Sequence, residues 1–105
     1  MVLIRLERYG EASKFLRKLT PVARRVLGEG NETTLRMRWT YAVALYKDDG
    51  ATLDDLLEAV ITFEDTARIA RRVLGGAHPL TEGMEGDLKN ARAALRARET
   101  PSTSA

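Results

Sequence analysis

The sequence predicts an all-α fold, in which about four antiparallel helices joined by short turns follow a short N-terminal helical stub. Apolar residues recur at spacings of three and four along most of the chain, which is the period of an amphipathic helix. The segment ARRVLG occurs twice, from Ala23 and from Ala70, which lie 47 residues apart. Gly, Asn, Asp and Pro gather between the apolar segments, where turns are expected.

The first copy of the repeated segment predicts a helix over residues 11–27 that Gly28 ends as a C-terminal cap. Before it, residues 2–8 are expected to be the end of an earlier helix, the stub, so that residues 1–28 form half of a repeat. Pro21 inside the pattern predicts a kink. One apolar stripe runs along this helix: Ala12, Phe15, Leu16, Leu19, Ala23 and Val26.

Residues 31–75 are expected to form one full repeat. Asn31 can cap a helix that runs to Tyr46 or Lys47 and is apolar on most of its circumference, so we expect neighbours on several sides of it. Thr52 and Asp55 have the spacing of a capping box at the start of the second helix, which Gly75 and Gly76 end.

Residues 79–98 are expected to form a capping helix, because Pro79 can occupy a first turn and only one clean apolar stripe follows. We expect residues 99–105 to be a disordered tail. The whole of residues 1–98 is then a single helical domain, in keeping with a length of 105 residues.

Short motifs within this pattern resemble the tetratricopeptide-repeat (TPR) family, in particular the long-repeat class of kinesin light chains. Arg8-Tyr9-Gly10-Glu11-Ala12 resembles the turn into a second helix of a repeat, and Ala59 with Phe63 resembles the packing positions of that helix. Val73-Leu74-Gly75 followed by His78-Pro79 and Thr81 is similar to a repeat boundary. The resemblance covers residues 2–95, although the period of 47 exceeds even the long form.

The resemblance implies a fragment of a TPR-like solenoid that serves as a non-enzymatic protein-interaction or scaffold module. In such folds a partner protein or peptide lies against the concave face that the first helices form. Arg36 and Lys47 would contact carboxylates on that face. The expected concave face consists of Arg36, Met37, Thr40 and Lys47.

Fewer than two repeats are present, whereas a solenoid usually needs three to cover its apolar faces. The chain is therefore expected either to be the C-terminal end of a longer array or to form a homo-oligomer. An alternative is a structural protein that assembles with itself and has no other ligand. The side chains expected to lack a full covering on the N-terminal side are Ile4, Leu6, Phe15 and Leu16.

Four arginines at the ends of the two repeated helices should form a basic edge: Arg24, Arg25, Arg71 and Arg72. Basic residues in a last turn complement the helix dipole, and this needs no ligand. A nucleic-acid-binding domain is an alternative that the small net charge of +2 does not favour. The aromatic residues Trp39, Tyr41 and Tyr46 are expected in the core rather than stacked on bases.

No catalytic or metal site is expected. His78 is the single histidine and lies in a turn, and the acidic residues around Gly50 lack the Glu that an EF-hand loop places six positions after its glycine. We therefore expect neither an enzyme nor a cofactor. Cysteine is absent, and an apolar run of three residues before Arg5 is too short for a signal peptide or a membrane span. A cytoplasmic protein without membrane contact is the expectation.

Overall fold

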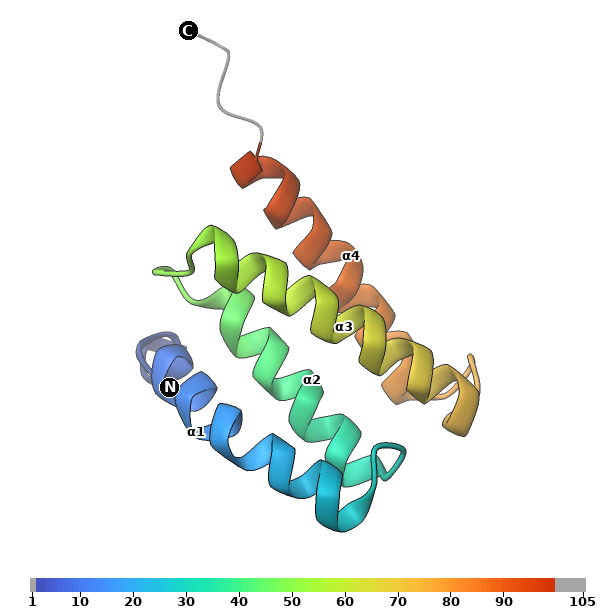
Figure 1. Ribbon diagram of the computed structural model, residues 1–105. Coiled ribbons are helices and arrows are strands. Elements are labelled where there is room, and N and C mark those ends of the chain that lie inside the picture. The colour runs from blue at the N-terminus through green and yellow to red at the C-terminus, as the bar shows by residue number, and fades with distance from the viewer. Residues whose placement is uncertain (1, 100–105) are drawn as a thin grey trace, which may run out of the picture.

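The computed structural model describes the backbone of residues 2–99 and the side chains of residues 8–99. Over this part of the chain it contains four helices and no strand: α1 (Val2–Leu27), α2 (Glu32–Lys47), α3 (Leu53–Leu74) and α4 (Pro79–Glu99). The predicted all-α class and the succession of helices and short turns are confirmed (Figure 1). Most of the predicted tail, residues 100–105, lies outside the described residues.

Helix α2 lies at the centre of the molecule. It packs against α1, α3 and α4, and α3 also packs against α4, whereas the described backbones of α1 and α3 make no contact. The expectation that the helix after Asn31 has neighbours on several sides is therefore confirmed. Figure 1 shows α1 and α3 on different sides of α2.

The helix ends follow the signals in the sequence. Gly28 and Gly75 have φ of +96° and +97°, a conformation that favours glycine, and each follows the last residue of a helix. Asn31 accepts a hydrogen bond from the Thr33 backbone N–H (2.8 Å). Thr52 and Asp55 form the reciprocal pair of bonds of a capping box.

Helix α1 differs from its prediction. It runs without interruption from Val2 to Leu27, so the expected stub joins the next helix with no turn at Gly10. The hydroxyl of Ser13 donates to the Gly10 carbonyl (2.9 Å), and nothing at Gly10 requires a positive φ. Pro21 lies inside this helix, and its side chain is exposed.

The core consists of two apolar clusters, and α2 contributes to both. Phe63 is fully buried at the centre of the first cluster, with Tyr41 and Leu45 of α2 beside it. Leu35 of α2 lies in the second, against Met84 of α4. Trp39 contacts both clusters. Of the three aromatics expected in the core, Tyr41 is buried, and Trp39 and Tyr46 are half-buried.

Candidate functional site

Helix α1 carries a row of exposed apolar side chains, here called the α1 stripe: Phe15, Leu19, Val22 and Val26. The exposed fractions of Phe15 and Val26 are 65% and 71%. The spacing of four, three and four residues places all four side chains on one face of the helix. Contact with α2 is made by a different face, on which Thr20 and Ala23 are buried. Phe15 and Val26 are therefore largely uncovered by the described residues, and Leu19 and Val22 are covered only in part.

The four residues expected to mediate self-association are distributed differently. Phe15 belongs to the α1 stripe. Leu16 is half-buried and packs against the first core cluster, so it is covered in part. Residues 15 and 16 point about 100° apart on a helix, and only one of them can face α2. The side chains of Ile4 and Leu6 lie outside the described residues.

Helix α3 also exposes apolar side chains. Leu53, Leu57 and Ile61 follow one another at a constant spacing of four, which drifts around the helix by about 40° at each step. Val73 is exposed near the end of the same helix. These residues do not form a straight row like the α1 stripe.

The residues expected on the concave face lie along α2. Arg36, Thr40 and Lys47 are exposed, and Met37 is half-buried. Two nitrogens of Arg36 donate to Glu32, at 3.2 and 2.9 Å, and the Thr40 hydroxyl donates to the Arg36 carbonyl (2.8 Å). The four residues expected on the concave face therefore lie on one helix, and Arg36 is already paired with Glu32.

The expected basic edge is partly neutralised. Arg71 makes two hydrogen bonds of 3.0 Å to Glu85, and Arg24 forms an ion pair with Glu29 (3.3 Å). Arg25 and Arg72 are exposed. Arg24 and Arg25 lie in the last turn of α1, and Arg71 and Arg72 lie in the last turn of α3. The described backbones of these two helices make no contact.

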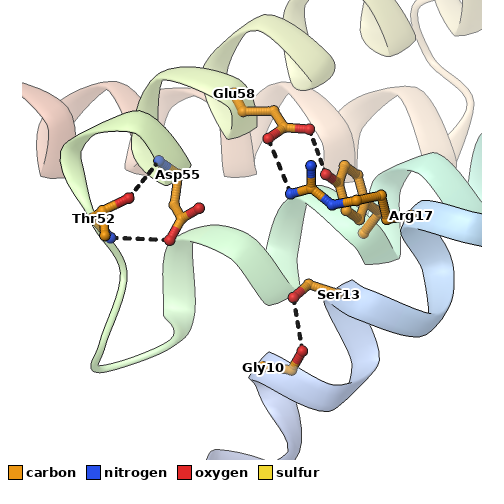
Figure 2. A network of polar contacts seen from close by, with 7 residues as sticks. Gly10, Ser13, Arg17, Thr52, Asp55 and Glu58 are labelled. Atoms are coloured by element: carbon orange, nitrogen blue, oxygen red, sulfur yellow. Dashed lines mark hydrogen bonds and ion pairs between the residues drawn. The ribbon is translucent and has the colours of Figure 1, made fainter.

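Between α1 and α3 lies a polar groove whose floor is α2, and sequence reasoning missed it. Arg17 of α1 forms an ion pair with Glu58 of α3 (3.3 Å), and the Tyr41 hydroxyl of α2 donates to the same carboxylate. The Arg17 guanidinium lies 5.6 Å from the centre of the Tyr41 ring. Figure 2 shows Arg17 reaching across the groove to Glu58. Burial and then the hydrogen bond to Glu58 raise the pKa of Tyr41.

A second polar cluster lies further along this groove. The buried Arg38 of α2 donates to Asp65 of α3 (2.7 Å), and Arg68 bonds to the same carboxylate. The hydrogen bond from Arg38 is the largest cause of a lowered Asp65 pKa, and Arg38, Arg68 and Arg24 add their positive charges. Arg38 stands between Met37 and Trp39 in a helix expected to be apolar on most of its circumference, and this was the one signal in the sequence that could have indicated the cluster.

Among the described residues no group of three or more acidic or histidine side chains is placed to hold a metal ion. A search of the described helices finds none with the length and apolarity needed to cross a membrane. Comparison with models of protein families, with curated proteins and with solved structures gives no match to this chain.

Proposed function

We propose that the chain is a non-enzymatic protein-interaction module of the TPR type, and that it binds a helix of a partner protein along the α1 stripe. The exposure of the α1 stripe carries this proposal. Large apolar side chains in a straight row on a helix are typical of a docking surface, because covering them removes apolar area from water. A row spaced by four and three residues suits another helix lying nearly parallel to α1.

The charges around the α1 stripe favour an acidic partner. Glu11 is the one acidic residue of α1 between Arg8 and Leu27. Lys14, Lys18 and Arg25 lie along one edge of the α1 stripe, whereas Arg17 and Arg24 face the groove on the other side of the helix. Two copies of α1 side by side would bring like charges together, which opposes association. A partner helix with apolar residues on one face and acidic residues along its edges avoids this repulsion.

The exposed side of α2 supports the same choice of partner. Arg36 and Lys47 carry positive charge there, and Thr40 lies between them along the helix. A TPR-type partner on this helix would offer a carboxylate to Lys47, whereas Arg36 is already paired with Glu32. The alternative, in which the chain assembles with itself, needs no acidic partner. Peptide binding and sedimentation together distinguish these two hypotheses.

Two synthetic amphipathic helices test the proposal. They share the same apolar face, and one carries Glu and the other Lys at the flanking positions. We expect the acidic peptide alone to bind in calorimetry, and we expect Phe15→Ser with Val26→Ser to weaken its binding by more than about tenfold. Val73→Ser, at an exposed apolar position on α3, is the matched control and should have no effect.

Sedimentation of the unmodified chain over a range of concentrations completes the test. We expect a monomer, because of the like charges on α1. A dimer that dissociates on Phe15→Ser with Val26→Ser would assign the α1 stripe to a second copy instead. Equal binding of both peptides, or equal weakening by Val73→Ser, would contradict a docking site on α1.

A further inference from the structure

The two halves of the chain are folded alike, and the offset of 47 residues between the two ARRVLG segments relates them. Gly28 and Gly75, which end α1 and α3, both have a positive φ. The side chain of Asn31 accepts a hydrogen bond from the backbone N–H two residues later (2.8 Å), and Nδ1 of His78 does the same (3.1 Å). Helix α1 packs on α2, as α3 packs on α4. Helix α1 therefore corresponds to α3, and α2 corresponds to α4.

The side of α3 that faces α2 is the counterpart of the α1 stripe. Asp65 of α3 accepts a hydrogen bond from α2 and so marks that side, and Ile69 lies one turn further along it. Ile69 is 6% exposed, whereas Val22, which stands 47 residues before it in the α1 stripe, is 41% exposed. Thr66 is also buried, whereas its counterpart Leu19 is exposed. In the second half of the chain, this face is thus covered by the helix that precedes it, α2.

A helix placed on α1 as α2 is placed on α3 would also contact α2. It would lie beside α2 in the way that α2 lies beside α4, because α2 corresponds to α4. Asp87 of α4 bonds to Trp39 and Tyr46 of α2. The counterpart of Asp87 on α2 is Thr40, which is exposed. One helix would therefore contact both the α1 stripe and the exposed side of α2.

One charge differs between the two faces, and it indicates what this helix carries. Arg38 of α2 donates a hydrogen bond to Asp65 of α3 (2.7 Å). The counterpart of Asp65 on α1 is Lys18, which is exposed. An arginine at the position of Arg38 would face this lysine, and the like charges would repel each other. A carboxylate at the same position would pair with Lys18. The difference also opposes the insertion of α2 from a second copy of the chain.

We propose that the partner is a single helix that packs on α1 as α2 packs on α3 and carries an acidic residue opposite Lys18. It runs in the opposite direction to α1, because a short turn joins α2 to α3. This inference rests on the proposed function, since it specifies the helix that binds the α1 stripe. It adds the direction of that helix, its contact with α2 at Thr40 and the position of one carboxylate.

Two synthetic peptides test the proposal by calorimetry against the full chain. One has the sequence of residues 31–48, and the other is the same peptide with Arg38→Glu. We expect the Arg38→Glu peptide to bind about tenfold more tightly, because a repulsion is replaced by an attraction. Lys18→Glu in the chain should reverse this order. Lys14→Glu is the matched control and should keep it, because the counterpart of Lys14 on α3 is Ile61, which is 62% exposed.

Two further measurements complete the test. Phe15→Ser with Val26→Ser should weaken binding of the Arg38→Glu peptide by more than about tenfold, which places this peptide on the α1 stripe. Thermal unfolding of Lys18→Glu should match that of the original chain, since Lys18 is exposed, so that a reversed order is not an effect of unfolding.

Equal binding of the two peptides, or a reversal by Lys14→Glu as strong as that by Lys18→Glu, would overturn this inference. The proposed function has a separate test in the Glu-flanked and Lys-flanked helices. If the Glu-flanked helix binds the α1 stripe while the two peptides do not differ, the docking site stands and only the placement of the partner helix is wrong.

Discussion

The two end helices, α1 and α4, use similar amphipathic sequences in opposite ways. Leu80 and Met84 of α4 are buried in the second core cluster, Leu88 and Leu95 pack half-buried against the first, and the other side of that helix carries exposed charged residues such as Lys89. Phe15 and Val26 of α1 are exposed instead. An amphipathic pattern therefore predicts a helix, but it does not say whether the apolar face is covered by the chain itself. The uncovered face is the one that needs a partner.

Truncating one apolar side chain on α4 and one on α1 should show the difference between these two helices most clearly. Met84→Ala leaves a cavity in the second core cluster and should lower the free energy of unfolding by about 2–5 kcal/mol. Phe15→Ala truncates a side chain that is 65% exposed and belongs to neither core cluster, and it should change the free energy of unfolding by less than about 0.5 kcal/mol. Urea unfolding of both variants measures the difference. Equal losses would mean that the α1 stripe stabilises the fold rather than a complex.

High pH should loosen the attachment of α4 to α2. Asp87 of α4 accepts hydrogen bonds from Trp39 (2.7 Å) and Tyr46 (3.0 Å), and burial together with Asp87 raises the pKa of Tyr46 from 10.0 to about 12. The folded chain therefore holds the Tyr46 proton more tightly than the unfolded chain. The resulting stability is complete below pH 10 and is lost as the pH rises to about 12.

Urea midpoints measured between these two pH values, together with the ultraviolet absorbance of tyrosinate, test this expectation. Tyr46→Phe has no proton to lose at this position and should show a smaller decline. Tyr41 contributes in the same direction, since its pKa is also raised. An identical decline in the Tyr46→Phe variant would show that Tyr46 does not couple α4 to α2.

Two glycines of α4 provide the smallest and most local test. Glycine inside a helix costs roughly 1 kcal/mol relative to alanine, and a Cβ at Gly86 would meet nothing within 4 Å. Gly86→Ala should therefore stabilise the chain by up to about 1 kcal/mol. A Cβ at Gly83 would lie 2.6 Å from the Trp39 ring, which would have to move away from Asp87, so Gly83→Ala should forfeit that gain. Equal stabilisation in thermal unfolding would show that α4 does not pack closely on Trp39.

The fold could be predicted because its signals are local. Gly28, Asn31 and Thr52 each fix a helix end through bonds to residues close by in the sequence. Gly10 gave the wrong signal, because glycine favours a turn only where the backbone needs a positive φ, and here it does not. A sequence pattern alone does not reveal that difference.

The candidate sites were less accessible to prediction. Phe15 was among the residues expected to be exposed, but the choice between Phe15 and Leu16 depends on how α1 is rotated against α2. The groove was missed because Arg17 and Glu58 are 41 residues apart, as Arg38 and Asp65 are 27 apart. Such pairs exist only once three helices have been placed in space.

The backbone of α1 contacts only α2 among the described helices, whereas α2, α3 and α4 all contact one another. Helix α1 can therefore detach in a partial opening while the other three stay together, at a smaller free-energy cost than global unfolding.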